Sequence, residues 1–346
     1  MRVWLDVLTP KQVLFFGPLI SSLRGEGCEV YATSRHYRET DILARAQGLR
    51  LRFVGRRGGK DLAEQLTEAT RRQEELIPLI NSFEPDVSIS AGSAVCARIS
   101  FGLRVRHVTI NDSPHSAVAD RLSLPLSHRL FCPWIIPYES WYRYGVGRGQ
   151  ISRYRALDPA AWLKRRAPKG EVPKLERNRE TIVVRLEETY APYMADSKKS
   201  WNEEILSALA RSFRGCNLVA LCRYGDQLRH MRRRFGETYI LPEAVDGRAL
   251  LEKTDVFVGM GGTMTAEASL MGVPSVSAFQ GSLYTEKYLL SVKLLDRATS
   301  TRQVAKVVGR LMAERTGPRK KRARRVLASM EDPVSKISSL ILGLPP

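Results

Sequence analysis

DVFVGMGGTMTAEASLMGVPSVSAFQG, residues 255–281, contains a short apolar run, two adjacent glycines and a segment that ends in a Gly-x-Pro turn. The apolar run predicts a buried strand at 255–260, and the residues from Thr263 to Met271 predict a helix. Because glycine has no Cβ, the backbone N–H groups at such a helix start can approach a phosphate closely. The order strand, glycine pair, helix therefore predicts a phosphate-binding turn at the edge of an α/β sheet.

Glu267 lies inside this predicted helix. It follows Gly262 by about one and a half turns at ~3.6 residues per turn, so it can point toward the same cleft. An ionised carboxylate can accept hydrogen bonds from both hydroxyls of a ribose. We therefore assign Gly261, Gly262 and Thr263 to a diphosphate and Glu267 to a ribose.

Apolar runs typical of buried strands alternate with helical patterns on both sides of this stretch. Those in the first half lie at 3–8, 28–34, 49–54, 86–91, 105–112 and 129–136. Those in the second half lie at 181–187, 217–223, 238–242, 255–260 and 273–279. Strands joined by helices form parallel, doubly wound sheets. The predicted fold class is α/β, with two Rossmann-like doubly wound domains that face a cleft.

The segment 158–179 divides these two series of strands. It contains three prolines and no apolar periodicity, which is typical of a linker. A chain of 346 residues also exceeds the ~100–200 residues of one average domain. We expect an N-terminal domain at 1–157, a linker at 158–179, a C-terminal domain at 180–317 and a helical tail at 318–346, with the option that the tail crosses back to the N-terminal domain.

The charge balance is strongly basic. Fifty-five Lys and Arg residues stand against 36 Asp and Glu residues, which gives a formal net charge of +19, and 41 of the basic residues are Arg. Guanidinium groups bind phosphates bidentately, so this excess favours a polyanionic partner such as a pyrophosphate, an anionic lipid surface or nucleic acid. An Arg-rich composition imposed by the genome or the habitat explains the excess equally well.

The sequence also bears on location and metal binding. No window offers the ~18 uninterrupted apolar residues of a membrane span, and Asp6 and Lys11 interrupt the apolar start that a signal peptide needs. The five cysteines are widely spaced and odd in number, which fits neither a disulfide framework nor a zinc site. We expect a cytoplasmic protein without a metal or cofactor, and we keep a peripheral membrane location as an option.

The glycine-rich stretch resembles the nucleotide-sugar signature of GT-B glycosyltransferases, as found in the lipid-linked N-acetylglucosaminyltransferase of peptidoglycan synthesis. The matching residues are Gly262, Thr263, Thr265, Glu267, Gly272 and Pro274. A wider similarity, from residue 1 to about 342, links the chain to a glycosyltransferase-like family called domain of unknown function 354. It is carried by DVLTPKQVLFFGPLI at 6–20, NDSPHSA at 111–117, VVRLE at 183–187 and GGTMTAEA at 261–268.

The resemblance implies that the N-terminal domain binds an acceptor and that the C-terminal domain binds a nucleotide-sugar, without an essential metal. One position departs from the family, which often has a histidine where this chain has Gln12. Glutamine does not titrate. Therefore, if that histidine is the general base in other members of the family, either the base of this chain lies elsewhere or this chain catalyses a different reaction.

Sugar transfer needs positive charge for the leaving diphosphate and a base for the acceptor hydroxyl. Arg185 and Arg223 end the first two strands of the C-terminal domain and are candidates for the diphosphate. Asp112 and His115 follow the strand at 105–112, and one of them is the candidate base, with Asp6 as a competitor. The alternative is that NDSPH forms a turn in which the aspartate caps the next helix.

The sequence thus predicts a metal-independent glycosyltransferase that uses a UDP- or GDP-type donor and an anionic or lipid-linked acceptor. A first alternative is an enzyme like the nucleotide-sugar 2-epimerases, which would act on the donor alone. A second is a protein that binds or modifies nucleic acid, with basic runs at 229–234 and 319–325 along the phosphates.

Overall fold

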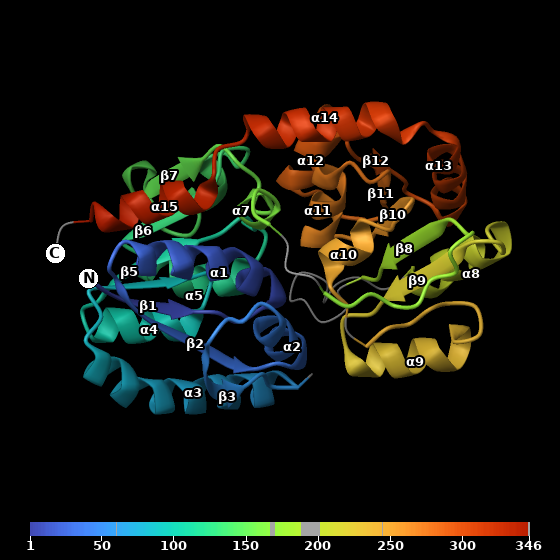
Figure 1. Cartoon of the computed structure of the whole chain (residues 1–346). Helices are drawn as coiled ribbons and strands as arrows, with labels where there is room; N and C mark the ends of the chain where they lie inside the picture. The colour runs from blue at the N-terminus through green and yellow to red at the C-terminus, as the bar shows by residue number, and fades with distance from the viewer. Residues whose placement is uncertain (60, 167–169, 188–200, 244, 345–346) are drawn as a thin grey trace. The chain divides into compact units, whose positions relative to one another are not determined.

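The structure is a computed structural model that describes residues 1–59, 61–166, 170–187, 201–243 and 245–344. The chain divides into two compact units (Figure 1). Unit 1 contains Met1–Lys164 and Glu331–Pro346, and unit 2 contains Arg165–Met330. Each unit holds one parallel sheet with helices between consecutive strands, which confirms the predicted class of two Rossmann-like α/β domains.

Unit 1 is built on a seven-stranded parallel sheet in the order β3-β2-β1-β4-β5-β6-β7. Its strands are β1 (Arg2–Asp6), β2 (Glu29–His36), β3 (Arg52–Arg56), β4 (Val87–Ser90), β5 (Arg106–Ile110), β6 (Arg129–Pro133) and β7 (Ile151–Tyr154). The chain starts at β1, runs outward to β3 and returns past β1 to β4. Parallel sheets bind ligands at the carboxyl ends of the strands beside such a reversal, here β1 and β4.

Helices cover the sheet of unit 1. They are α1 (Pro10–Gly25), α2 (Arg38–Ala46), α3 (Leu62–Phe83), α4 (Ala94–Gly102), α5 (Ala117–Ser123), α6 (Glu139–Tyr142), α7 (Ala160–Leu163) and α15 (Pro333–Leu342), with 3-10 turns at Leu124–Leu126 and Arg148–Gln150. Trp4 of β1 packs in one buried cluster with Leu76 and Ile80 of α3 and with Cys96 and Ile99 of α4. Helix α15 packs against α1, as Figure 1 shows, although some 300 residues separate them in sequence.

Unit 2 has a five-stranded parallel sheet in the order β12-β11-β10-β8-β9. Its strands are β8 (Thr181–Arg185), β9 (Asn217–Leu221), β10 (Val256–Gly259), β11 (Ser275–Ser277) and β12 (Asp296–Arg297). The strand predicted at 238–242 is reduced to a single parallel bridge between Ile240 and Val219 of β9. The order of connections reverses between β8 and β10, so the predicted glycine turn after β10 lies where a ligand is expected.

The helices of unit 2 are α8 (Asn202–Ser212), α9 (Gly225–Phe235), α10 (Gly247–Leu251), α11 (Thr263–Met271), α12 (Tyr284–Ser291), α13 (Thr301–Ala313) and α14 (Thr316–Ser329). Helix α11 packs between its sheet and α14, and Gly272 at its end lies against the backbone of Lys320. The apolar periodicity of 197–213 predicts a helix from Ser197, a residue that lies outside the described ranges.

The structure also departs from the sequence predictions elsewhere. Strand β7 extends the first sheet beyond the six strands predicted, because ISRY is too short and polar to stand out as a buried run. Helix α7 lies within the predicted linker, yet its four residues are buried and belong to unit 1. The tail divides, since α14 belongs to unit 2 and α15 to unit 1.

Among the helices that the structure describes, none is both long and apolar enough to cross a membrane.

Candidate functional site

The turn between β10 and α11 contains the predicted glycine pair. Gly261 and Gly262 have φ values of 84° and 93°, a region that residues with a Cβ rarely adopt. A Cβ on Gly261 would lie 2.9 Å from the Phe279 ring, and one on Gly262 would lie 2.9 Å from Nη2 of Arg223. The N-cap of α11 is Gly262, which has no side chain to bond the first N–H groups. The positive end of α11 is therefore suited to an anion.

Arg223 follows β9 and contacts this turn directly. Its Nη2 donates to the carbonyl of Gly261 at 3.0 Å, and its Nε donates to the carbonyl of Leu186 at 2.9 Å. These two bonds fix the guanidinium beside the glycine pair. Its charge therefore adds to that of the helix N-terminus.

Arg185 is the last residue of β8 and pairs in register with Gly259, the last residue of β10. Its Nη1 donates to the carbonyl of Cys222 at 2.9 Å. The structure thus places both predicted arginines at the carboxyl ends of neighbouring strands.

Glu267 lies in the second turn of α11, and 5% of its surface is exposed. A carboxylate sheltered from water in this way forms stronger hydrogen bonds with a ligand than an exposed one does. Thr265, two residues earlier, is also buried, and its hydroxyl has no hydrogen-bond partner among the described residues. A Cβ on Gly259 would collide with that hydroxyl, so α11 packs closely on β10.

A second polar cluster lies in unit 1, where β1, β5 and β7 end. Nζ of Lys11, at the start of α1, lies 2.6 Å from Oδ1 of Asp112 and 2.7 Å from Oδ2 of Asp158. The Tyr154 hydroxyl donates a hydrogen bond to Asp158 at 2.5 Å, and the Ser113 hydroxyl donates one to Asp112 at 2.8 Å. One ammonium group therefore joins two carboxylates that follow different strands.

This cluster sets the charge state of Asp112. Burial alone would raise the pKa of Asp112, but the charge of Lys11 and its hydrogen bond hold that pKa below its ordinary value. Burial raises the pKa of Asp158 although Lys11 opposes it. The two carboxylates raise the pKa of Lys11 in spite of its burial. Asp112 is therefore ionised at neutral pH and is a weak proton acceptor.

His115 lies in the same turn, between Asp112 and α5. Burial lowers the pKa of His115 below its ordinary value of 6.5, and the nearby charge of Asp112 opposes this shift only in part. The imidazole is consequently neutral at pH 7, which is the form that accepts a proton. The carbonyl of Pro114 accepts bonds from Arg143 Nη2 at 2.6 Å and from the Tyr144 hydroxyl at 2.7 Å, so the turn is held in place.

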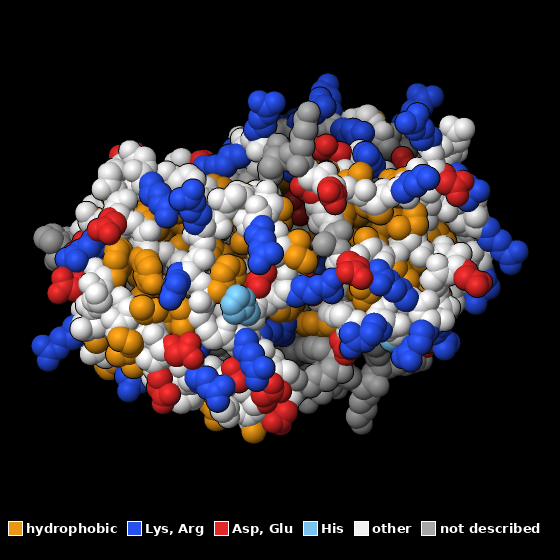
Figure 2. Space-filling model, turned by 60° about the horizontal axis from the view of Figure 1, so that its bottom comes forward, with side chains coloured by type: hydrophobic (Ala, Val, Ile, Leu, Met, Phe, Trp, Pro, Cys, Tyr) orange, Lys and Arg blue, Asp and Glu red, His pale blue; other side chains and the backbone are white. Residues whose placement is uncertain are grey.

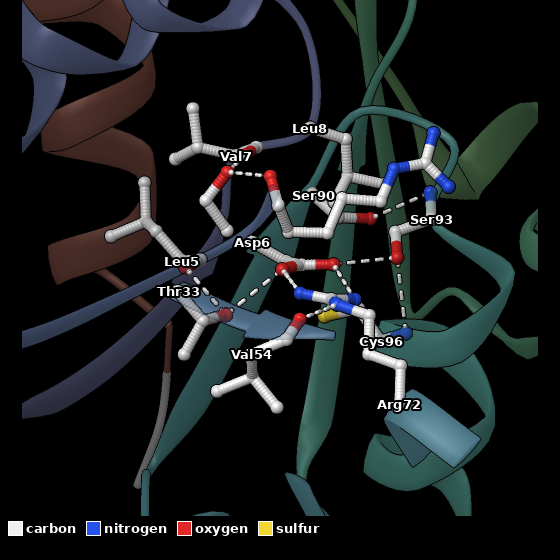
Figure 3. Close-up of polar contacts among 12 residues, drawn as sticks. Leu5, Asp6, Val7, Leu8, Thr33, Val54, Arg72, Ser90, Ser93 and Cys96 are labelled. Atoms are coloured by element: carbon white, nitrogen blue, oxygen red, sulfur yellow. Dashed lines mark hydrogen bonds and ion pairs between the residues drawn. The ribbon is translucent and has the colours of Figure 1, made fainter. Parts of the chain in front are cut away.

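The third acceptor-side candidate, Asp6, lies in a separate network (Figure 3). Its carboxylate is fully buried and accepts from Arg72 Nη2 at 2.6 Å and Nη1 at 3.1 Å, Ser93 Oγ at 2.7 Å and Thr33 Oγ1 at 2.8 Å. Burial would raise the pKa of Asp6, but Arg72 and the two hydroxyls lower it. These four bonds use the full acceptor capacity of a carboxylate. They favour a structural role for Asp6 over a role as a base.

Gln12 has a structural role in the turn after β1. Its side-chain oxygen accepts from the N–H of Leu8 at 2.6 Å, and its Nε2 donates to the carbonyl of Ala91 at 3.1 Å. The amide therefore joins the turn after β1 to the turn after β4. Glutamine suits this task because it both donates and accepts.

Basic side chains are spread over the face of the molecule drawn in Figure 2, with acidic side chains among them. On α9, Arg232 and Arg234 pair with Glu243 at 3.1 Å and Glu203 at 2.8 Å. In the 319–325 run, Arg319 is buried and contacts Glu314 and Asp296. These ion pairs neutralise part of the positive charge of the basic runs at 229–234 and 319–325. This weakens the alternative that the protein binds nucleic acid. Within the described ranges, no three His, Cys, Asp or Glu side chains form a group that could hold a metal ion.

Apart from Asp6, the structure brings the predicted residues into two sets and adds three that the sequence did not indicate. Gly261, Gly262, Thr263 and Arg223 meet at one turn of unit 2, Arg185 ends the neighbouring strand β8, and Glu267 lies inside α11. Asp112 and His115 meet in unit 1, with Lys11, Asp158 and Tyr154 as additional members. Lys11 and Asp158 lie a few residues after the ends of β1 and β7, but β7 was not predicted, and Asp158 falls in the proline-rich segment predicted to be a linker.

Solved structures of low sequence identity share this fold. A putative UDP-N-acetylglucosamine 2-epimerase from Listeria monocytogenes matches with a TM-score of 0.76 and 14% identity, over 99% of this chain and 94% of that protein. The glycotransferase of kitacinnamycin matches with a TM-score of 0.65 and 15% identity, over 99% and 98% of the two chains. At such identities the matches establish the GT-B fold and nothing finer.

A sequence relative covers nearly the whole chain. An uncharacterised protein of Methanocaldococcus jannaschii is 28% identical over 324 residues, which is 89% of this chain and 90% of the relative. The family described as a protein of unknown function, DUF354, matches residues 1–342. Because the match spans both units, this chain, which has the GT-B fold, belongs to the DUF354 family.

Proposed function

We propose that this protein is a glycosyltransferase that moves a sugar from a nucleotide-sugar donor to an anionic or lipid-linked acceptor. The observation that carries the proposal is the turn at Gly261 and Gly262, with Arg223 bonded to it and with Glu267 buried in the helix that follows. A positive helix end, a fixed guanidinium and a sheltered carboxylate are the groups that a diphosphate and a ribose require.

On the donor side, the glycine pair and Thr263 bind the diphosphate of a UDP- or GDP-sugar. Arg185 and Arg223 neutralise the negative charge that develops as the diphosphate leaves. Glu267 binds the ribose hydroxyls. Because two guanidinium groups and a helix N-terminus supply the positive charge, the proposed reaction needs no metal ion.

On the acceptor side, His115 removes the proton from the hydroxyl that attacks the sugar. Its lowered pKa keeps it neutral, and therefore able to accept a proton, at pH 7. Asp112 is a positioning residue: held ionised by Lys11, it stabilises the imidazolium that forms on His115.

The test is a panel of UDP-, GDP-, CDP- and ADP-sugars, measured first by thermal shift and then by turnover in EDTA. A ligand present at ~100 times its dissociation constant stabilises a fold by about 2.7 kcal/mol, so the true donor stands out. Loss of turnover in EDTA that magnesium restores would contradict the metal-free reaction.

A second candidate is a 2-epimerase, which the fold similarity to the Listeria protein favours. An epimerase converts its UDP-sugar with no acceptor present, whereas a transferase does not. Product analysis in acceptor-free reactions therefore separates the two activities.

Replacing Glu267 by Ala should weaken nucleotide-sugar binding by roughly 1.5–3 kcal/mol, which is about 10- to 150-fold in the dissociation constant, because a charge-assisted pair is lost. Calorimetric titration measures the change, and unfolding midpoints check the fold. Glu237→Ala, an exposed carboxylate in the same unit, is the control and should bind normally. An unchanged dissociation constant in Glu267→Ala would remove the ribose assignment.

A peripheral membrane location is part of the proposal and depends on α14. Its exposed basic residues are Lys320, Lys321, Arg322, Arg324 and Arg325, whereas Arg319 is buried. Each basic residue near an anionic bilayer contributes about 1 kcal/mol. Exposed charges of this kind are screened by salt.

Neutralising Lys320, Lys321, Arg324 and Arg325 to Gln should therefore reduce binding to anionic liposomes steeply and leave donor affinity unchanged. Liposome sedimentation at several salt concentrations measures the effect. A charge-matched control neutralises four exposed arginines on other elements: Arg50, Arg52, Arg211 and Arg214. If both variants bind alike, or if the wild type binds neutral liposomes equally, α14 does not direct the protein to membranes.

A further inference from the structure

Helix α5 contains a buried aspartate that neither the donor site nor the proposed base uses. Asp120 has none of its surface exposed. Its Oδ1 accepts a hydrogen bond from Nδ2 of Asn111 at 2.7 Å. Its Oδ2 is buried as well and has no hydrogen-bond partner among the described residues. Within that part of the chain, a single neutral amide therefore hydrogen-bonds to this carboxyl group.

A comparison with Asp6 shows what this lack of donors means for the charge of Asp120. Both carboxyl groups are fully buried in unit 1, but Asp6 accepts two bonds from Arg72 and one from each of two hydroxyls. A buried carboxylate is costly without such donors, and a carboxyl group escapes the cost by taking up a proton. Burial accordingly raises the pKa of Asp120 to about 7, although the Asn111 bond and the charge of Arg143 oppose it.

The charged groups around Asp120 do not replace the missing donors. Arg143, directly after α6, attracts the ionised carboxyl group and Asp112 repels it. Nη2 of Arg143 donates instead to the carbonyl of Pro114 at 2.6 Å. Helix α4 packs against α5, and further titratable side chains on these two helices and the segments beside them are Cys96, Arg98, His115, Arg121 and Tyr144. Of these described side chains, none forms a hydrogen bond or an ion pair with Asp120.

Asn111 joins Asp120 to the turn that carries Asp112 and His115. The side-chain oxygen of Asn111 accepts from the N–H of Ser113 at 2.8 Å, so its Nδ2 faces Asp120. The Ser113 hydroxyl in turn donates to Asp112 at 2.8 Å. Because an amide side chain has one accepting and one donating end, residue 120 has to offer an acceptor to Asn111.

Asp120 also holds the far end of this turn. Its backbone N–H donates to the carbonyl of Ser116 at 3.0 Å, and the N–H of Ser116 donates to the carbonyl of Ser113 at 2.9 Å. His115 lies between these two serines. Residue 120 therefore contacts the turn twice, through its backbone at the end of the turn and through Asn111 at the start.

We propose that Asp120 is a positioning residue, an uncharged carboxyl group that fixes Asn111 and thereby the turn on which Asp112 and His115 lie. Its effect on His115 as a base rests on the proposed function, whereas its protonation and its contacts do not. Ionisation of Asp120 keeps Oδ1 an acceptor, so it costs stability and preserves the orientation of Asn111.

The pH dependence of stability tests the charge state. The folded wild type should keep a proton on Asp120 that the unfolded chain loses near the ordinary aspartate value of 3.8. Because the folded state then binds more protons than the unfolded state, the wild type should lose stability relative to Asp120→Asn as the pH rises from about 4 to about 7. Asparagine has the same shape as the protonated side chain and does not titrate.

Chemical denaturation of the full chain at several pH values measures this difference. Asp86→Asn is the matched control, because Asp86 is an exposed aspartate of the same unit, and its difference from the wild type should stay constant over the same pH range. A constant difference for Asp120→Asn as well would mean that the carboxyl group is charged, which overturns the proposal.

The NMR signal of His115 tests the positioning. The chain has five histidines, and after isotope labelling of histidine the His115 signal is the one that His115→Gln lacks. Asp120→Asn should leave the shift and the titration midpoint of this signal unchanged, since its amide oxygen still accepts from Asn111. Asp120→Leu, which is similar in size but has no acceptor, should change both and leave the signal of the exposed His128 in place.

A His115 signal that is identical in the wild type, Asp120→Asn and Asp120→Leu would overturn the positioning role. If Asp120→Leu does not fold, Asn111→Ala removes the same hydrogen bond from the other side and should change the His115 signal in the same way. An unchanged signal in that variant overturns the role equally.

Turnover connects the inference to the proposed function. With the UDP- or GDP-sugar that the wild type uses, Asp120→Leu should lower kcat at least tenfold at unchanged donor affinity, and the conservative variant Asp120→Asn should restore the rate. An unchanged kcat in Asp120→Leu would overturn the effect on the reaction. If the wild type turns over no nucleotide-sugar, the proposed function fails, and denaturation and NMR still decide the role of Asp120.

Discussion

Replacing His115 by Gln should lower kcat by about 10²- to 10⁴-fold, the usual contribution of a general base, and leave the affinity for the nucleotide-sugar unchanged. Glutamine keeps much of the size and hydrogen bonding of the imidazole but cannot take a proton. The measurement is steady-state turnover together with donor titration. His128→Gln is the control, because His128 is an exposed histidine of the same unit, and it should retain full activity.

The pH profile gives this prediction a second readout. Since burial lowers the pKa of His115, the wild-type rate should fall only as the pH drops below 6.5, with its midpoint under the ordinary histidine value. Asp112→Asn removes the charge that opposes this shift, so the acid limb should move to still lower pH. A kcat within twofold of the wild type in His115→Gln would place the base elsewhere.

Replacing Arg72 by Met should destabilise the fold by about 3–5 kcal/mol, because it leaves the Asp6 carboxylate buried without its ion pair. Chemical denaturation measures the loss as a lower midpoint. Arg71→Met is the control at the adjacent position, where the side chain is 60% exposed, and its midpoint should change little. The stability that the Asp6–Arg72 ion pair contributes should also be lost in acid. Because the pKa of Asp6 is lowered in the folded state, this contribution disappears as the pH falls through that lowered pKa.

The double variant Asp6→Leu, Arg72→Met tests whether Asp6 is structural. Replacing a whole buried ion pair by apolar residues is often close to neutral, so this variant should recover most of the stability lost in Arg72→Met. It should also keep donor binding. A stable double variant without turnover would return Asp6 to the list of candidate bases, whereas a double variant as unstable as Arg72→Met would show that Thr33 and Ser93 need the carboxylate.

The turn at Gly261 and Gly262 could be predicted because its signal is local. Strand, glycine pair and helix follow one another within residues 255–271, and each residue's conformation depends on its near neighbours. The fold class follows in the same way from repeated apolar runs. Strand β7 was missed because its four residues, ISRY, alternate polar and apolar groups at the sheet edge.

The unit 1 clusters could not be predicted, because their members come from distant parts of the chain. Lys11, Asp112 and Asp158 follow three different strands, and only the strand order brings them together. Arg72 stands in a polar run, RRQEE, in which nothing marks it as the buried partner of Asp6. The sequence therefore predicts Asp6 as a possible base, although hydrogen bonds in the structure already occupy the acceptor positions of its carboxylate.

The return of α15 to unit 1 makes that unit discontinuous in the chain, with unit 2 inserted between its parts. On the ribosome, the surface of α1 that α15 covers stays uncovered while residues 165–330 are made, roughly 10–30 s at ~5–20 residues per second. Unit 2 can fold in that interval, whereas unit 1 must wait for the last residues of the chain. The buried apolar residues Val334, Ile337 and Ile341 of α15 can thus complete the packing of unit 1 only after the whole of unit 2 has been made.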